Sequence, residues 1–132
     1  MSKQEPIKAM EIHGAKKKIV LAGNPNVGKS VFFNSLTGIY VDVSNFPGTT
    51  VDVSHGHFEE YAVIDTPGVY GISSFNDEEK VARDVILTAD LIVNVVDAVH
   101  LERDLFLSLQ VIETGIPTII VLNMMDDAKR EG

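Results

Sequence analysis

The 132-residue sequence contains no cysteine, which excludes disulfide bonds, thiolate metal sites and thiol catalysis. It also lacks any apolar run approaching the roughly 20 residues of a membrane-spanning helix, and its polar first residues do not form the apolar segment of a signal peptide. Acidic residues outnumber basic ones and give a net charge of −8, which argues against binding of nucleic acid or anionic membranes. These absences predict a soluble, cytoplasmic protein.

The chain does contain enough apolar sequence for one globular domain. Hydrophobic residues make up 45% of the chain and charged residues 23%, proportions that are typical of globular rather than disordered proteins. The length also suits a single domain. Residues 1–17 are polar, and we predict a flexible leader there. The domain itself is predicted over residues 18–132.

Strand and helix patterns alternate along this predicted domain, and two of the strands meet tightly at Glu59-Glu60. The alternation predicts an α/β fold with a mostly parallel sheet, one antiparallel hairpin and helices on both faces. Ligands of such sheets bind at the carboxyl ends of the strands. The predicted strands are Lys18–Gly23, Thr50–Phe58, Tyr61–Asp65, Asp90–Asp97 and Pro117–Leu122. The predicted helices are Lys29–Thr37, Asn76–Thr88 and Leu101–Thr114, and Ile39–Thr49 is predicted as a loop.

The strongest motif lies where the first predicted strand meets the first helix. The segment from Gly23 to Ser30 fits G-x-x-x-x-G-K-[ST], the P-loop that surrounds phosphates. Glycines permit the tight turn, and backbone N–H groups face phosphate oxygens. Lys29 supplies a charge for the outer phosphates and Ser30 a hydroxyl for Mg²⁺. A chance glycine-rich turn is the alternative. The predicted phosphate-binding residues are Gly23, Asn24, Pro25, Asn26, Val27, Gly28, Lys29, Ser30 and Val31.

A second motif, Asp65-Thr66-Pro67-Gly68, follows a predicted strand. Asp65 can hold Mg²⁺ through water, opposite Ser30, and the N–H of Gly68 can meet the terminal phosphate. An ordinary turn is the alternative, because all four residue types favour turns. We predict that Asp65, Thr66, Pro67 and Gly68 contact the nucleotide.

Thr49 and Thr50 lie in the loop before the second predicted strand. One of their hydroxyls can complete the coordination of Mg²⁺ and close over the terminal phosphate, and such a loop would order with a triphosphate and relax on hydrolysis. The spacing favours Thr50. The alternative is that both are β-branched residues opening a strand.

The third motif, Asn123-Met124-Met125-Asp126, follows the last predicted strand. Asp126 can accept hydrogen bonds from N1–H and the exocyclic amine of guanine, whereas adenine would leave its charge unpaired. Asn123 would brace the P-loop and the base. A helix N-cap is the alternative. With Met124, these residues predict GTP or GDP as the ligand.

In this order the motifs resemble those of the translation-factor-related GTPases. From Lys18 to Gly132 the chain more narrowly resembles the N-terminal G domain of the ferrous iron transport protein B family, most specifically in Asn45-Phe46-Pro47-Gly48 and Leu122-Asn123-Met124-Met125-Asp126. The resemblance implies a Ras-like P-loop G domain that hydrolyses GTP. It also implies coupling, through a following helical domain, to a membrane segment that transports Fe²⁺.

The resemblance further implies roles for single residues. Asn26 matches an asparagine that helps bind K⁺ beside the phosphates in potassium-activated relatives, although turn geometry is an alternative reason for an asparagine there. Val69 stands where Ras-like enzymes carry a water-orienting glutamine, which implies slow hydrolysis. The implied catalytic residues are Lys29, Thr50, Gly68 and Asn26, with Mg²⁺ held by Ser30, Thr50 and Asp65 and K⁺ by Asn26.

The sequence departs from the family pattern at its end. No counterpart of the family's Ser-Ala loop, which lies over the guanine, follows Asp126, and the last strand and helix of the G domain are missing. We therefore expect weaker guanine binding than in a complete G domain. We also expect the strand Pro117–Leu122 to form an unprotected sheet edge that pairs with a second copy of the chain or recruits a partner.

Three functions remain open. The first is a domain that hydrolyses GTP slowly with Mg²⁺, stimulated by K⁺, as the cytoplasmic regulatory part of a ferrous iron transporter. The alternative is a nucleotide-dependent switch module with little or no hydrolysis, acting on a membrane or helical partner. The third is a GTPase of ribosome assembly or tRNA modification, which the acidic charge and the Asn-Phe-Pro-Gly loop disfavour.

Overall fold

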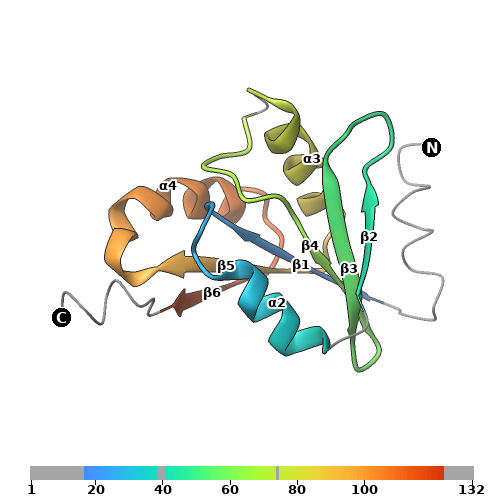
Figure 1. Cartoon of the computed structure of the whole chain (residues 1–132). Helices are drawn as coiled ribbons and strands as arrows, with labels where there is room; N and C mark the ends of the chain where they lie inside the picture. Colours follow the sequence, from blue (N-terminus) through green and yellow to red (C-terminus); the bar gives the residue numbers. More distant parts are fainter. Residues whose placement is uncertain (1–16, 39–40, 74, 124–132) are drawn as a thin grey trace.

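The computed structural model describes residues 17–38, 41–73 and 75–123, which form a six-stranded sheet with helices on both faces (Figure 1). Among these residues no helix combines the length and the apolar character that crossing a bilayer requires. The strands are β1 (Lys17–Gly23), β2 (Asp42–Asn45), β3 (Asp52–Phe58), β4 (Tyr61–Asp65), β5 (Leu91–Asp97) and β6 (Thr118–Asn123). The helices are α2 (Lys29–Thr37), α3 (Asp77–Ile86) and α4 (Leu101–Ile112), with a short 3₁₀ turn, η2 (Ala98–His100), before α4.

The strands lie in the order β2-β3-β4-β1-β5-β6 across the sheet. β1 runs parallel to β4 and to β5, and β5 runs parallel to β6. β3 is antiparallel to both β2 and β4, and Glu59 turns the chain between β3 and β4 with a left-handed φ of 56°. The predicted α/β fold with a mostly parallel sheet is therefore confirmed, and β3 is the one antiparallel strand among the described residues. Because β1, β4, β5 and β6 are parallel, their carboxyl ends meet at one edge, and the three sequence motifs all follow these ends.

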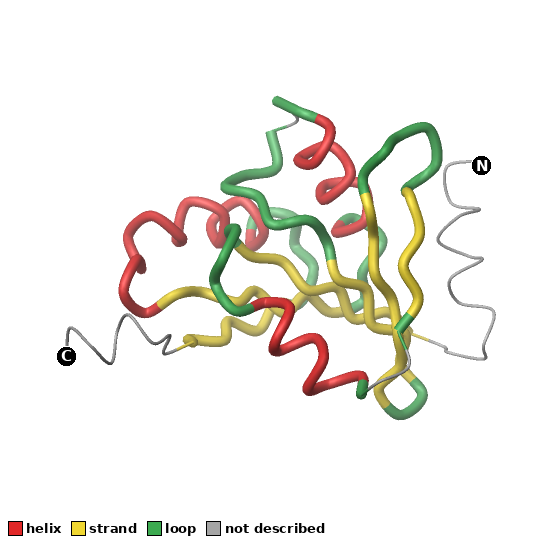
Figure 2. The backbone as a smooth tube through the Cα atoms, viewed as in Figure 1, coloured by secondary structure: helices red, strands yellow, loops and turns green. Residues whose placement is uncertain are grey.

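Side chains of the central strand β1 alternate between two cores, because successive residues of a strand point to opposite faces. Val20 and Ala22 join the core under α3 and α4. Ile19 and Leu21 join the core under α2, together with Phe33 of that helix. Figure 2 shows the same arrangement in outline, with α2 on one side of the sheet and α3 and α4 on the other. The end of β1, where the P-loop begins, is thus held from both faces.

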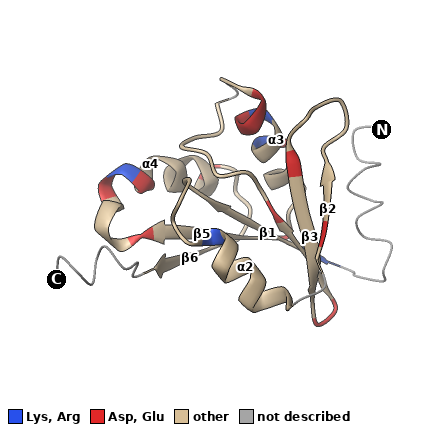
Figure 3. Cartoon of the chain, viewed as in Figure 1, with Lys and Arg blue, Asp and Glu red and all other residues tan. Residues whose placement is uncertain are grey.

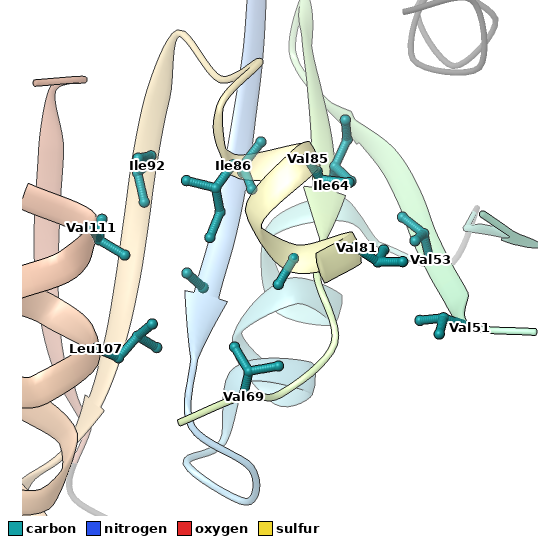
Figure 4. Packing of buried hydrophobic residues seen from close by; sticks show 13 residues of the cluster. Val51, Val53, Ile64, Val69, Val81, Val85, Ile86, Ile92, Leu107 and Val111 are labelled. Atoms are coloured by element: carbon teal, nitrogen blue, oxygen red, sulfur yellow. The ribbon is translucent and has the colours of Figure 1, made fainter. Parts of the chain in front are cut away.

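The larger core lies beneath α3 and α4 (Figure 4). Val81 and Val85 of α3 are spaced four residues apart, so they face the sheet on one side of that helix, and they are 1% and 0% exposed. Leu107 and Val111 of α4 repeat this spacing and are fully buried. Burial of each such side chain contributes roughly 1.5–3 kcal/mol. This packing fixes the two helices against the strands whose ends carry the motifs.

The largest difference from the sequence prediction is β2. The loop predicted at Ile39–Thr49 contains the strand Asp42–Asn45, which pairs with β3 in the register Asp42↔His55 to Asn45↔Asp52. All four residues of β2 are exposed, so its sequence lacks the alternation of apolar and polar residues that predicts a strand. Backbone hydrogen bonds to β3 at the sheet edge stabilise it instead. The strand predicted from Thr50 begins only at Asp52, because the preceding residues form the turn of this hairpin.

Smaller differences concern the ends of elements. β1 begins one residue before the predicted strand, at Lys17, so that residue belongs to the sheet and not to the predicted leader. Asn76 is the N-cap of α3 and not its first residue, since its side chain accepts a hydrogen bond from the N–H of Glu79. α3 and α4 each end two residues before the prediction, at Ile86 and Ile112. None of these differences moves a motif.

Within the described residues, β6 forms one edge of the sheet and pairs only with β5. Ile119, Ile120 and Leu122 of this strand are exposed. The edge position agrees with the sequence prediction for this strand. Pairing of the edge with a second chain stays a prediction.

Asp97 connects the end of β5 to α4 through a group of polar contacts, of which the one to Asp104 is buried. Its Oδ1 accepts a hydrogen bond from the N–H of Val99 at 2.9 Å, and its Oδ2 lies 2.9 Å from Nδ1 of His100. The backbone N–H of Asp97 donates to the buried carboxylate of Asp104 at 2.8 Å. Burial alone would raise the pKa of the Asp97 carboxyl, but the bonds from His100 and Val99, with the charges of His100 and Arg103, lower it overall.

We expect Asp97→Asn to destabilise the fold by about 1 kcal/mol near neutral pH, because a charge-assisted bond is lost. A carboxyl with a lowered pKa stabilises the fold above its unfolded pKa, and this contribution disappears as the pH falls through the folded pKa. The difference between wild type and Asp97→Asn should therefore shrink below about pH 4. Urea unfolding between pH 3 and 7 measures it. Glu60→Gln, in the exposed turn between β3 and β4, is the control, and an equal difference at all pH values would contradict the prediction.

Candidate functional site

The P-loop connects the end of β1 at Gly23 to the start of α2 at Lys29. Two of its residues have left-handed backbone angles, Asn26 with φ 64° and Gly28 with φ 87°, which glycine adopts freely and asparagine tolerates. Gly28 is the N-cap of α2 and provides no side-chain bond to the first helical turn. The N–H groups of that turn are therefore free of a side-chain cap and suit an anion.

A 440 Å³ pocket lies over this turn, and its volume is in the range of small-molecule sites. It brings together the P-loop and Gly68, which are far apart in the sequence, as the motifs predict. Thr49 and Thr50 are not among its lining residues. The pocket is lined by Asn24, Pro25, Asn26, Gly28, Lys29, Ser30, Val31 and Gly68.

Gly23, the last residue of β1, packs tightly against β5 and the P-loop. A Cβ atom on Gly23 would lie 2.8 Å from the carbonyl oxygen of Val95 and 3.0 Å from Cγ2 of Val27. The first contact involves backbone, which cannot move aside as a flexible side chain does. The first glycine of the motif is therefore required by packing at the base of the loop.

Lys29 and Asp65, predicted from separate motifs, are in direct contact. Nζ of Lys29 bonds Oδ1 of Asp65 and the carbonyl oxygen of Thr66, and the Lys29 and Asp65 side chains are 9% and 11% exposed. Burial raises the pKa of the Asp65 carboxyl, and the charge and hydrogen bond of Lys29 act against that rise. Figure 3 shows the basic residue at the start of α2, where Lys29 lies.

The Asp65–Gly68 motif and Val69 lie against the end of β1 and the P-loop. Oγ1 of Thr66 donates to the carbonyl of Leu21 at 2.7 Å, and the N–H of Val69 donates to the carbonyl of Gly23 at 3.0 Å. A Cβ on Gly68 would lie 2.9 Å from Cα of Pro25. Only glycine therefore fits between the two loops at this point.

The two threonines of the β2–β3 loop differ in their hydrogen bonds. Oγ1 of Thr49 donates to the carbonyl of Phe46 at 2.7 Å and accepts from the N–H of Val51 at 3.1 Å. Its hydroxyl thus stabilises the turn. Thr50 is exposed, which leaves it the better candidate of the two for a metal ligand, in line with its spacing.

Asn123, at the end of β6, reaches the P-loop across β5. Its Nδ2 donates to the carbonyl of Val27 at 2.8 Å. This contact joins Asn123 to the P-loop, and the predicted contact of Asn123 with the base stays a prediction. Met124 and Asp126, predicted to contact the guanine, lie outside the described residues.

A pair of buried polar residues next to the end of β1 was not predicted from the sequence. Nδ2 of Asn94 in β5 donates to the carbonyl of Ala22 at 3.2 Å, and Oγ of Ser108 in α4 bonds Oδ1 of Asn94. Both residues are 1% exposed. The pair ties α4 to the end of β1. A polar residue within the apolar run Leu91–Val96 was the signal that could have identified it.

Residues 17–132 match the family model described as Ferrous iron transport protein B. Among curated relatives, the Fe(2+) transporter FeoB of Methanocaldococcus jannaschii is 49% identical over 104 residues, which cover 74% of this chain and 16% of the relative. The chain therefore spans about a sixth of that relative's length.

Solved structures of similar proteins have the same fold. A GDP-bound variant of S. thermophilus NFeoB matches with a TM-score of 0.82 at 47% identity, over 88% of this chain and 48% of that one. The G domain of the T. maritima FeoB iron transporter matches with a TM-score of 0.77 at 40% identity, over 86% of this chain and 76% of that one. The predicted P-loop G-domain fold is thereby confirmed.

Proposed function

The chain belongs to the ferrous iron transport protein B family, and from this we propose that it binds GTP and hydrolyses it slowly to GDP with Mg²⁺. The whole relatives are Fe²⁺ transporters of which this chain matches a small part. We propose that it serves as the cytoplasmic regulatory part of such a transporter. The GDP bound to the S. thermophilus relative supports guanine nucleotide as the ligand.

The observation that carries this proposal is the P-loop pocket, which Lys29 and Gly68 line, together with the bond from Lys29 to Asp65. Lys29 would move from Asp65 and the Thr66 carbonyl to the outer phosphates. Asp65 and Ser30 offer oxygen atoms, the ligand type that Mg²⁺ prefers, and Thr50 would add a third. Bound Mg²⁺ would neutralise charge on the phosphates. The N–H of Gly68 would bond the terminal phosphate.

Slow hydrolysis is supported by Val69, which follows the Asp65–Gly68 motif. Val69 is 4% exposed and packs in the core under α3 and α4. A buried aliphatic side chain cannot orient an attacking water, which a glutamine does in Ras-like enzymes. Backbone groups of the two loops would position the water instead. The same observation favours the second candidate function, a switch module that binds nucleotide with little hydrolysis.

Measuring the release of phosphate by the purified chain distinguishes a GTPase from a switch module with little hydrolysis. GTP and ATP are each supplied with Mg²⁺ in K⁺ or in Na⁺ buffer. Turnover of GTP alone, faster in K⁺, is the expected result. Binding of GTP without release of phosphate would favour the switch module, and equal use of ATP would contradict the guanine-reading role proposed for Asp126.

We expect Asn26→Gly to abolish stimulation by K⁺, so that the ratio of rates in K⁺ and Na⁺ falls to about 1 from about 10 or more. Glycine accepts the φ of 64° at this position, so the change removes the side-chain oxygen while preserving the turn. The rate in Na⁺ should change little. Persistent stimulation in Asn26→Gly would show that turn geometry, and not K⁺ binding, explains the asparagine.

A further inference from the structure

Asn24, the first residue after β1, has an unusual side chain for a buried position. The residue is 1% exposed. Its Oδ1 and Nδ2 atoms are both shielded from solvent, and neither has a hydrogen-bond partner among the atoms of the described structure. A carboxamide offers two donors and one acceptor, so its whole bonding capacity is unused at this point of the P-loop.

Asn94 shows that the fold does satisfy buried amides nearby. It is also 1% exposed, yet it donates to Ala22 and accepts from Ser108. Buried polar groups in native proteins are nearly always bonded, and exceptions point to a functional reason. A buried amide without hydrogen bonds raises the free energy of the folded state. A rearrangement that gives the Asn24 amide a hydrogen-bond partner would therefore be favourable.

The neighbouring segment is the loop proposed to contact the terminal phosphate. Gly68 packs against the P-loop backbone, and a Cβ there would lie 3.5 Å from the carbonyl carbon of Asn24. The next residue, Val69, is tied to Gly23 by a backbone bond of 3.0 Å. Asn24 and Gly68 also line the same pocket. The segment that packs against the Asn24 backbone carries the carbonyl of Pro67, which has no N–H, and the N–H and C=O groups of Gly68 and Val69. A small shift of Gly68 would bring one of these groups to the Asn24 amide.

We propose that Asn24 is a positioning residue whose side-chain amide bonds the backbone of residues 67–69 when the N–H of Gly68 turns toward the terminal phosphate of GTP. This inference rests on the proposed GTP-binding function. GDP has no terminal phosphate to draw Gly68, so the amide keeps its present surroundings when GDP binds. Asn24 therefore contributes to the preference for GTP over GDP and to turnover.

The test replaces Asn24 by leucine, which has a similar size and no hydrogen-bonding group. Asn24→Ala serves as a smaller second variant, and Asn34→Leu, at an exposed position of α2, is the matched control. Affinities for GDP and for a non-hydrolysable GTP analogue are measured for the 132-residue chain, together with thermal unfolding without nucleotide. Amide hydrogen exchange of residues 66–70 reports the loop directly.

We expect both Asn24 variants to lower the ratio of GTP-analogue affinity to GDP affinity about tenfold, the effect of one or two hydrogen bonds. Without nucleotide Asn24→Leu should be as stable as wild type or more stable, because no hydrogen bond is lost and the side-chain volume is similar. Protection of residues 66–70 by the GTP analogue should decrease. The control should match wild type in all of these measurements.

Two results would overturn the inference alone: equal weakening of GDP and GTP-analogue binding, or loss of stability in both variants without nucleotide. Either would mean that Asn24 supports the loop structurally. If wild type bound neither GDP nor the GTP analogue, the proposed function would fail as well.

Discussion

Lys29→Met is expected to weaken GTP binding about 100-fold and to destabilise the folded chain by about 3 kcal/mol. The first effect is the loss of the charge that meets the outer phosphates. The loss of stability arises because the Asp65 carboxylate would stay largely buried while losing its ion-pair partner, Lys29. Burial already raises the pKa of Asp65 against the effect of Lys29, so removing the lysine raises it further.

The two effects of Lys29→Met can be separated with a second substitution. In Lys29→Met/Asp65→Asn the buried charge is removed, so most of the stability should return while the loss of GTP affinity remains. Urea unfolding and titration with a GTP analogue measure the two quantities. Lys80→Met, in an exposed position of α3, is the control. If Lys29→Met alone were as stable as wild type, the ion pair would contribute nothing to the fold.

Gly68→Ala is expected to lower GTP turnover about 100-fold, with a much smaller effect on GDP affinity. A methyl group at this position would lie 2.9 Å from Cα and 3.1 Å from N of Pro25. Neither backbone atom can rotate away, so the loop must shift away from the P-loop. A displacement of about 1 Å at a reacting centre costs roughly 100-fold in rate, and GDP lacks the phosphate that Gly68 would contact.

Gly71→Ala provides the matched control for Gly68→Ala. A Cβ at Gly71 would lie 2.8 Å from Oε1 of Gln110 and 3.1 Å from the ring of Phe106. Both contacts are to side chains, which can rotate, so turnover should fall far less. Single-turnover kinetics with GTP compare the two variants. Similar losses in both would mean that any added bulk in this segment slows the reaction and that the contact with Pro25 has no special role.

Motifs with local requirements could be predicted from the sequence. The P-loop needs glycines at fixed spacing between a strand and a helix, and β1 and α2 lie where this pattern places them. The Asp65–Gly68 motif likewise follows β4 as predicted. These features depend on the properties of neighbouring residues along the chain.

Features that depend on partners distant in sequence could not be predicted. β2 is exposed throughout and exists because β3 pairs with it. The bond between Asn94 and Ser108 requires β5 and α4 to pack first. The predicted fold already placed the motifs of Lys29 and Asp65 near each other. It did not predict that the two side chains bond directly. The separate roles of Thr49 and Thr50 likewise depend on the geometry of a turn.

The antiparallel ladder of β2, β3 and β4 has a mechanical consequence for the loop that carries Thr50. Ser54 of β3 pairs with Asp65 of β4, and a ladder changes register only in steps of two residues if its buried face is to stay buried. The loop therefore cannot slide gradually along β3. Val51, which is 7% exposed and packs in the core, fixes one end of this loop, and the pairing of Asn45 with Asp52 fixes the other. A movement that brought Thr50 to a nucleotide would therefore be confined to residues 46–50, while Ser54 stayed paired with Asp65.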